Sequence, residues 1–323
     1  MVLYLTEADV RSIVSLPETI ERMANMFRDR ANGHAFDVPR RRMRQPGGHL
    51  HIMQAAAPKL DAIGFKYYYT GSASRTTLIH LHTLTTGRFE AMIEADWLGM
   101  MRTAATTGVA TRALAREDAS VVACFGTGRH GGHQLAAVAA VRPIREARAY
   151  GRNHERRDRF CAEMSARLSI EVQPVDSASE AIAGADIVNI ITRASTPVFD
   201  GSLLQAGQHV NAAGANALDR REIDLAAVRR SDVIVVDSRD VARDECGDLL
   251  PAVEAGLVHW DQLPDLGDVL VERRPGRTNS GQITLFESQG MCLEDIYVAR
   301  QVVNVARQRG IGIDLPIPPP APA

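Results

Sequence analysis

Gly126-Thr127-Gly128-Arg129-His130-Gly131 is the stretch that decides the fold, because it stands between an apolar run at residues 120–125 and a helical pattern at residues 134–141. A strand, a glycine-rich turn of the form GxGxxG and a helix make up the dinucleotide-binding element of a Rossmann domain. The first glycine makes the turn, the second lets backbone N–H groups approach a pyrophosphate, and the third lets the helix pack on the strand. We therefore expect Gly126, Thr127, Gly128, Arg129 and His130 to bind a dinucleotide; an ordinary tight turn is the alternative.

The hydrophobic pattern changes along the chain. Downstream of the turn, apolar runs at residues 145–150, 170–175, 186–192, 209–213 and 233–237 alternate with helical patterns. This alternation predicts a parallel sheet covered by helices on both faces. Upstream, short runs rich in β-formers at residues 49–53, 63–69, 78–84 and 89–93 follow one another without helices, which indicates an antiparallel or mixed sheet. The sequence thus predicts an α/β protein with a doubly wound Rossmann sheet and a second sheet.

Composition excludes several classes of protein. The 323 residues carry a formal net charge of −2, so no overall field points to nucleic acid or to an anionic membrane. The four cysteines lie far apart and show no metal-ligand spacing, so neither a metal site nor a disulfide framework is expected. No apolar run reaches bilayer length and the first residues show no leader pattern, which predicts a cytoplasmic protein. The proline-rich tail at residues 315–323 is expected to be disordered.

The second strand of the Rossmann pattern indicates which dinucleotide binds. A site for NAD usually has an Asp or Glu at the end of this strand, where it binds the ribose 2′-hydroxyl. Here Glu146 lies at the start of the strand, and the strand ends in Gly151-Arg152-Asn153. An arginine at this place can bind a 2′-phosphate. We expect Arg152 and Asn153 to favour NADP, with NAD possible; the alternative for Arg152 is an exposed side chain without a role.

Several segments taken together resemble the ornithine cyclodeaminase/μ-crystallin family over nearly the whole length, from about Leu5 to Gly312. Each segment alone is weakly specific, but their ordered set is specific. They are Leu50-His51-Ile52-Met53, Gly64-Phe65-Lys66, Thr86-Gly87, Met101-Arg102-Thr103-Ala104-Ala105, Gly126 to Gly131, Gly184-Ala185-Asp186-Ile187-Val188, Gly214-Ala215-Asn216, Arg221-Glu222-Ile223-Asp224, Cys246-Gly247-Asp248-Leu249 and Thr284-Leu285-Phe286-Glu287-Ser288-Gln289-Gly290.

The resemblance implies a domain plan and a class of reaction. A Rossmann domain at residues 117–290 would be inserted in a smaller α+β domain, formed by residues 1–116 and 291–323, that binds substrate and forms a homodimer. The family's reactions pass through the imine of an α-amino acid: amino-acid dehydrogenation, ketimine reduction, or cyclodeamination with internally recycled NAD.

The resemblance also implies substrate-binding residues. An α-imino or α-keto acid carries a carboxylate, which fixed cations bind best. The family's basic positions correspond here to Arg41, Lys66 and Arg102, with Arg40 as the alternative to Arg41 because a slip of one residue is possible. Lys66 ends an apolar strand, and Arg102 precedes small residues that allow close approach of a helix. For each cation the alternative is a charge that faces solvent.

One position departs from the family. Asn216 stands where cyclodeaminase-type members have an aspartate thought to move protons. An amide can orient a substrate nitrogen, but it cannot act as acid or base. His80 and His82, on one face of the strand at residues 78–84, could supply protons or could be sheet-surface residues. Thr192 and Ser288 are expected at strand ends that face the cofactor.

The sequence therefore predicts an NAD(P)H-dependent oxidoreductase that acts on the imine or amine of an α-imino or α-amino acid, as a ketimine reductase or an amino-acid dehydrogenase. Two alternatives stay open. One is an ornithine cyclodeaminase-type lyase with tightly bound NAD, and the other is a non-catalytic NADPH-binding protein.

Overall fold

The computed structural model describes residues 1–71 and 76–316. The chain divides into two compact units: Met1–Thr103 together with the segment from Met291 onward, and Ala104–Gly290. The division falls inside one continuous helix, α3 (Asp96–Leu114). The domain boundary expected after residue 116 stays a prediction. Of the tail predicted to be disordered, residues 317–323 lie outside the described residues.

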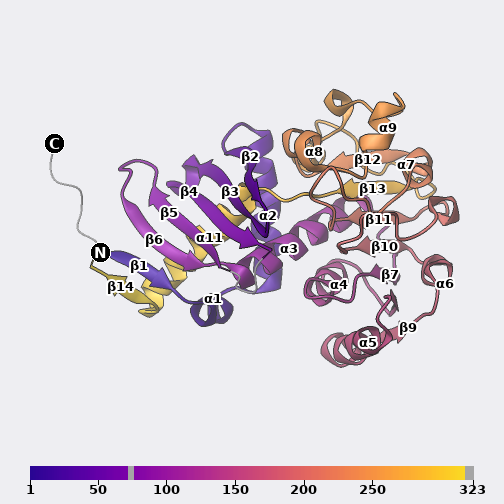
Figure 1. Ribbon diagram of the computed structural model, residues 1–323, viewed down its shortest axis with the longest axis horizontal. Helices are drawn as coiled ribbons and strands as arrows, with labels where there is room; N and C mark the ends of the chain where they lie inside the picture. Colours follow the sequence, from indigo (N-terminus) through magenta and orange to yellow (C-terminus); the bar gives the residue numbers. More distant parts are fainter. Residues whose placement is uncertain (72–75, 317–323) are drawn as a thin grey trace. The chain divides into compact units, whose positions relative to one another are not determined.

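The first unit is built on a seven-stranded mixed sheet in the order β14-β1-β6-β5-β4-β3-β2 (Figure 1). Strands β2 to β6 form an antiparallel meander, whereas β1 pairs parallel to β6 and antiparallel to β14. The bounds are β1 (Val2–Leu5), β2 (Phe36–Gln45), β3 (Gly48–Ala57), β4 (Ala62–Thr70), β5 (Thr77–Thr83), β6 (Phe89–Glu94) and β14 (Ile313–Leu315). The mixed sheet expected from the consecutive β-rich runs is confirmed.

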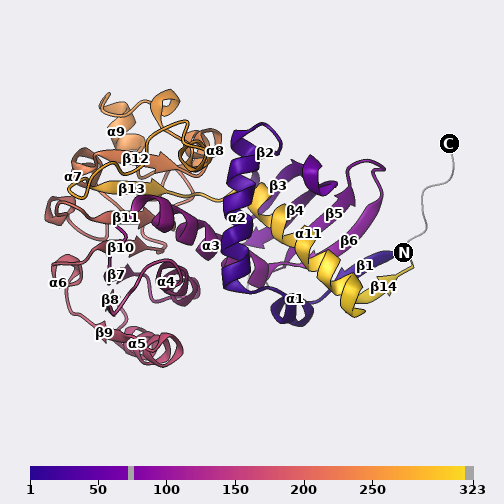
Figure 2. The ribbon, with the colours of Figure 1, turned by 180° about the vertical axis from the view of Figure 1, so that it is seen from behind.

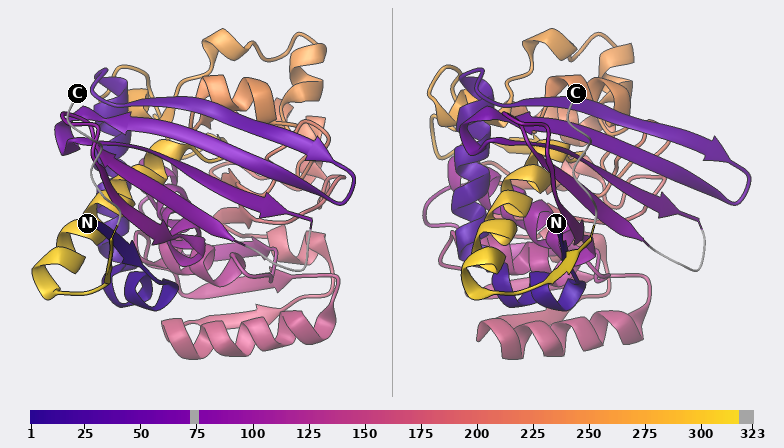
Figure 3. Two further views of the ribbon diagram at one scale, coloured as in Figure 1. Left: turned by 60° about the vertical axis from the view of Figure 1, so that its left-hand side comes forward. Right: turned by 90° about the vertical axis from the view of Figure 1, so that its left-hand side faces the viewer.

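Helices cover one face of this sheet. The buried helix α11 (Cys292–Arg309) packs on β2 to β5, and α2 (Leu16–Ala31) packs against α11 (Figure 2). Figure 3 shows α11, in yellow, running along the side of the layer of long strands. Two shorter elements complete the unit, α1 (Glu7–Ile13) and the 3-10 turn η1 (Pro58–Leu60). Helix α11 therefore brings residues from the far end of the chain under the strands of the N-terminal segment.

The second unit has a seven-stranded, all-parallel sheet in the order β12-β13-β11-β10-β7-β8-β9 (Figure 1). Its strands are β7 (Val121–Phe125), β8 (Glu146–Tyr150), β9 (Glu171–Pro174), β10 (Ile187–Ile190), β11 (His209–Ala212), β12 (Val233–Val236) and β13 (Thr284–Glu287). The Rossmann-like sheet predicted from the alternating pattern is confirmed. The strand order reverses between β7 and β10, and ligands of such sheets bind at the carboxyl ends near that reversal.

Helices of 5 to 15 residues connect these strands. They are α4 (Gly131–Ala139), α5 (His154–Leu168), α6 (Ala178–Ile182), α7 (Leu225–Arg230), α8 (Arg239–Glu245), α9 (Leu250–Glu254) and α10 (Leu266–Leu270), with the 3-10 turns η2 (Gly201–Leu203) and η3 (Trp260–Gln262). Among the described residues, no helix combines the length and the apolar character needed to cross a bilayer.

Candidate active site

The glycine-rich turn has the close contacts that its sequence requires. Gly126 follows β7 with φ of +109°, and a Cβ there would lie 2.3 Å from the carbonyl oxygen of Ile191. A Cβ on Gly131, at the start of α4, would lie 2.2 Å from the carbonyl oxygen of Gly126. A Cβ on Gly128 would meet no atom within 4 Å. The first and third glycines thus let the turn close, whereas the second leaves the backbone open to a ligand.

The end of β8 lies beside this turn. A Cβ on Gly151 would lie 3.1 Å from Oγ1 of Thr127. Arg152 and Asn153 are exposed, and the side chain of Asn153 caps α5 by accepting a hydrogen bond from the backbone N–H of Arg156 at 2.8 Å. Capping is therefore one role of Asn153 that the sequence did not predict.

Glu146 lies at the opposite end of β8. It is the first residue of the strand, and its carboxylate accepts hydrogen bonds from Arg148 at 2.5 Å and from Gln173 at 3.1 Å. The carboxyl end of β8 is the end that borders the glycine-rich turn. Glu146 therefore does not stand where an acid would bind the ribose of NAD.

Three further predicted residues follow strands of the same sheet. Thr192 comes after β10, and both its backbone N–H and its hydroxyl donate to Oε1 of Glu222 at 2.5 Å. Ser288 comes after β13, is buried, and donates to Oδ2 of Asp237 at 2.9 Å. Asn216 follows β11 in a half-buried loop. The two hydroxyls are thus engaged by buried acids, and the cofactor-binding roles of Thr192 and Ser288 stay predictions.

In the first unit, Lys66 and Arg102 are brought together by a pair of acids. Asp295 accepts from Nζ of Lys66 through Oδ2 and from Nε of Arg102 through Oδ1, the latter at 3.1 Å. Glu294 accepts from Nη1 of Arg102 at 2.5 Å. Lys66 is 3% exposed, Arg102 8%, and both acids are fully buried. Such a cluster is rigid, because buried charges must keep their partners.

Burial acts on the charges of this cluster. It lowers the pKa of Lys66, and the positive charge of Arg102 lowers it further, while Asp295 opposes both effects. Burial also disfavours the charge of Arg102, but Asp295 and Glu294 outweigh it and raise the pKa of the guanidinium. Arg102 is thus a permanent cation, and Lys66 gives up its proton more readily than an exposed lysine does.

The structure brings Arg40, and not Arg41, to the same region. Arg40 is 6% exposed, and its Cζ lies 5.9 Å from the centre of the Tyr68 ring. Nζ of Lys66 lies 5.8 Å from the same ring. Arg41 is exposed, and the expectation that it turns inward is corrected in favour of the alternative, Arg40. The physical reason is a β-bulge between Val38 and Arg41, which shifts the alternation of side chains along β2.

His51 is a further titratable residue on this face. It is buried and stacks on Tyr68 with 4.3 Å between ring centres, and its Nε2 lies 2.9 Å from Oγ1 of Thr70. Sequence reasoning did not assign a role to His51, Tyr68, Glu294 or Asp295. A local signal was available for the two acids, since they interrupt a run that is otherwise apolar from Met291 to Ala299.

His80 and His82 lie on the opposite face of the sheet. Ile79 of β5 pairs with Lys66, and side chains alternate between the two faces along a strand. His80 and His82 therefore point to the face away from Lys66. His80 stacks between Phe65 and Phe89, with ring centres at 4.7 and 5.2 Å, and burial lowers its pKa. The structure therefore supports the sheet-surface interpretation of these histidines, not a role beside Lys66.

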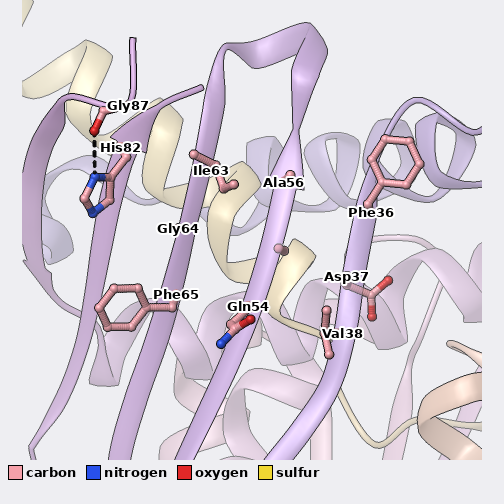
Figure 4. Close-up of a pocket in the computed structure, with 11 residues that line it drawn as sticks. Phe36, Asp37, Val38, Gln54, Ala56, Ile63, Gly64, Phe65, His82 and Gly87 are labelled. Carbon is pink, nitrogen blue, oxygen red and sulfur yellow. Dashed lines mark hydrogen bonds between the residues drawn. The ribbon is translucent and has the colours of Figure 1, made fainter. Parts of the chain in front are cut away.

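This second face of the sheet is apolar and hollowed. A depression of about 450 Å³ is lined by Phe36, Asp37, Val38, Gln54, Ala55, Ala56, Ile63, Gly64, Phe65, His82 and Gly87 (Figure 4). Phe36 is 56% exposed, Val38 46% and Ile63 38%. Large apolar side chains exposed together on one face are typical of an interaction surface.

The described residues contain no cluster of three or more His, Cys, Asp or Glu that could hold a metal ion. The four cysteines, which lie in the described part, are buried and unpaired.

The model of the ornithine cyclodeaminase/mu-crystallin family matches residues 2–310. The chain belongs to this family.

Members of the ornithine cyclodeaminase/mu-crystallin family with different activities are similar to the chain. An uncharacterized cyclodeaminase, y4tK of Sinorhizobium fredii, is 32% identical over 95% of this chain and 97% of its own length. The structure of Thermococcus litoralis Δ1-pyrroline-2-carboxylate reductase with NADH and L-proline is 32% identical, with a TM-score of 0.92, over 97% of this chain and 100% of that one. An archaeal alanine dehydrogenase dimer with bound NAD is 28% identical, with a TM-score of 0.90, over 97% and 98%.

Proposed function

We propose that this chain is an NAD(P)H-dependent reductase of α-imino acids, which in the reverse direction is an amino-acid dehydrogenase. The observation that carries the proposal is the cluster of Arg40, Lys66 and Arg102, three buried cations on one face of a sheet. A carboxylate is the ligand that such a cluster binds best, and every α-imino acid has one. When bound, the nicotinamide supplies the hydride that reduces the imine carbon.

Asp295 and Glu294 hold Lys66 and Arg102 in place but occupy only some of the N–H donors of these two cations. Lys66 has three N–H donors and Arg102 five. In the described structure their side chains donate to Asp295 and Glu294 through one atom of Lys66 and two of Arg102. The remaining donors are thus fixed in direction before substrate binds, which limits the entropy lost on binding. Tyr68 and His51 would form the wall against which the substrate's carbon chain packs.

Reduction also requires a proton on the imine nitrogen. Asn216 has an amide that can orient this nitrogen but cannot protonate it. His51 is the imidazole that the structure brings to the Tyr68 ring and hence near the cations. We assign the proton to the iminium form of the substrate or to His51, and orientation to Asn216. Cyclodeamination needs several proton transfers, for which an amide at position 216 is poorly suited.

The test is a substrate panel. Oxidation of NADPH and NADH would be followed with cyclic α-imino acids, and with α-keto acids in the presence of ammonia or methylamine. The proposal expects turnover with at least one imine. Ammonia release from L-ornithine with catalytic amounts of NAD, without turnover of any imine, would instead establish the lyase. Tight binding of NADPH without either activity would show that the chain is a non-catalytic NADPH-binding protein.

We also propose that NADPH is preferred over NADH, because Arg152 is exposed at the end of β8 and no acid stands there. Arg152→Asp should move the ratio of the two kcat/KM values about 10- to 100-fold toward NADH, since one charge-assisted contact is lost and a repulsion is added. Arg167→Asp makes the same charge change in the last turn of α5 and is the control. Equal or tighter binding of NADH by the unaltered chain would contradict this assignment.

The apolar face of the first sheet is, in this proposal, covered by a second copy of the chain. A two-fold dimer buries the same patch on both copies, and the related archaeal alanine dehydrogenase is described as a dimer. Ultracentrifugation should therefore find twice the chain mass of 35.2 kDa. Ile63→Asp should yield monomers, whereas Leu257→Asp, at a more exposed apolar position in the second unit, should not. A monomeric parent chain would overturn the proposal.

A further inference from the structure

Glu222 is a fully buried acid to which the proposed reaction assigns no role. Its Oε1 accepts from the backbone N–H and the hydroxyl of Thr192, both at 2.5 Å. Its Oε2 accepts from the backbone N–H groups of Gly214 at 2.6 Å and Ala215 at 3.0 Å. Both oxygens thus use their full capacity as acceptors. One carboxylate ties the loop after β10 to the loop after β11.

The loops around Glu222 approach each other more closely than a side chain at Gly214 would allow. A Cβ there would lie 2.4 Å from the carbonyl oxygen of Thr192 and 2.5 Å from Oε1 of Glu222. Behind Glu222, Oδ1 of Asp248 accepts from the backbone N–H groups of Glu222 at 2.5 Å and Ile223 at 2.9 Å. Glu222 is therefore itself held in place by a second buried acid.

The contacts continue to the glycine-rich turn. Strand β10 pairs with β7, and the carbonyl oxygen of Ile191 occupies the space that a Cβ on Gly126 would need. A continuous set of contacts thus runs from Gly126 through Ile191 and Thr192 to Glu222. From Glu222 it reaches Gly214 and Ala215, which precede Asn216. This set follows the carboxyl edge of the parallel sheet, where such folds bind their ligands.

We propose that Glu222 is a positioning residue for the dinucleotide site: its ionised carboxylate holds the loops that carry Thr192 and Asn216 in the geometry that binds the nicotinamide cofactor. The inference rests on the proposed function only for the identity of the cofactor. Protonation of Glu222 would replace an acceptor by a donor that faces other donors, and would loosen both loops.

The charges around Glu222 give this role a pH dependence. Burial and, after it, the negative charge of Asp248 raise the pKa of Glu222 to about 7, although the hydrogen bonds from Thr192 and Gly214 oppose the shift. The pKa of Asp248 is raised to about 6, first by burial, with Arg221 opposing. Glu287 and Cys246 complete the group, and burial raises the pKa of both. Cofactor affinity should therefore rise with pH through about 7, where Glu222 ionises.

Stability should change in the opposite sense. A carboxyl group whose pKa is higher in the folded state stabilises the fold while it is protonated, and this contribution is lost as the pH rises through the folded value. If cofactor affinity merely followed the stability of the fold, it would decrease as the pH rises. The proposed role of Glu222 predicts that cofactor affinity increases instead.

The experiment measures the dissociation constants of NADPH and NADH by direct titration, which needs no substrate. Glu222→Gln keeps the shape but leaves two of the four donors without an acceptor, so both constants should increase about 10- to 100-fold. The step near pH 7 should disappear from the affinity profile. In kinetics, KM for the cofactor should rise more than kcat falls. Thr192→Val should weaken binding less, and Thr192→Ser, which restores the hydroxyl, should recover most of the loss.

Asp186 provides a matched control. Its carboxylate accepts from the backbone N–H groups of Ser120 at 2.7 Å and Val121 at 3.0 Å, at the amino end of the same sheet. Asp186→Asn should lower stability without changing cofactor affinity. Unchanged affinity in Glu222→Gln, or equal weakening in Asp186→Asn, would overturn the proposal. If Glu222→Gln does not fold, equal affinities of the two Thr192 variants would overturn it. Because binding alone is measured, failure of the reductase assignment would be seen separately.

Discussion

Replacing Arg102 with leucine should lower the free energy of unfolding by about 3–5 kcal/mol, because the change leaves buried acids without their partner. Glu294 would lose its ion pair, and Asp295 would keep Lys66 alone. The measurement is chemical denaturation followed by circular dichroism. Arg307→Leu on α11, the helix that carries Glu294 and Asp295, is the control. Arg307 pairs with Glu90 at 3.5 Å and is half exposed, so its loss should cost less than about 1 kcal/mol.

The Arg102 effect should also depend on pH. Burial raises the pKa of Glu294, and Arg102 opposes this shift. Without Arg102 the folded-state pKa would rise further, so protonation would stabilise the variant at low pH and this stabilisation would be lost as the pH rises. The deficit of the variant relative to the parent chain should therefore be smaller in mild acid than at neutral pH. A deficit like that of Arg307→Leu at every pH would contradict the cluster as described.

Arg40→Leu should lower kcat/KM for the imino acid about 10- to 200-fold, the effect of losing one or two charge-assisted hydrogen bonds to a carboxylate. Arg41→Leu, the adjacent change of the same kind, should have less than about a threefold effect, because an exposed charge on the other face contributes little. The measurement is the initial rate of NAD(P)H oxidation at limiting imino acid. A larger effect at Arg41 would show that the carboxylate binds elsewhere.

The fold could be predicted from the sequence where local pattern determines structure. The turn from Gly126 to Gly131 is specified by its own glycines, since Gly126 has a positive φ and a Cβ on Gly131 would meet the carbonyl oxygen of Gly126 in the same turn. Strands that are buried on both faces of the parallel sheet are apolar throughout, whereas strands of the mixed sheet have one buried face and alternate between apolar and polar residues. The mixed sheet and the parallel sheet were therefore both predictable before any coordinates.

The candidate site was predictable only in part, for reasons of geometry. The choice between Arg40 and Arg41 depends on a bulge after Val38, and no local residue pattern specifies it. Glu294 and Asp295 stand in the first turn of a helix, where acids are common because they interact with the helix dipole. Their role as partners of Lys66 and Arg102 depends on contacts that span about two-thirds of the chain.

Glu222 shows the same limit in the second unit. Its acceptor atoms bind groups 7, 8 and 30 residues away, and none of these separations corresponds to a known local motif. In the sequence, Glu222 stands out only as part of the segment Arg221-Glu222-Ile223-Asp224, one of those that carry the family resemblance. The departure at Asn216 was visible, whereas the buried acid that supports its loop was not.

Transfer of deuterium from labelled cofactor tests the central proposal most directly. The chain would be incubated with NADPH or NADH deuterated at C4 of the nicotinamide and with Δ1-pyrroline-2-carboxylate or another imine from the panel, and the product would be analysed by mass spectrometry. The account predicts one deuterium at the α-carbon and one oxidised cofactor for each amino acid formed. Absence of label in every product, with ammonia released from L-ornithine and no net oxidation of cofactor, would contradict it.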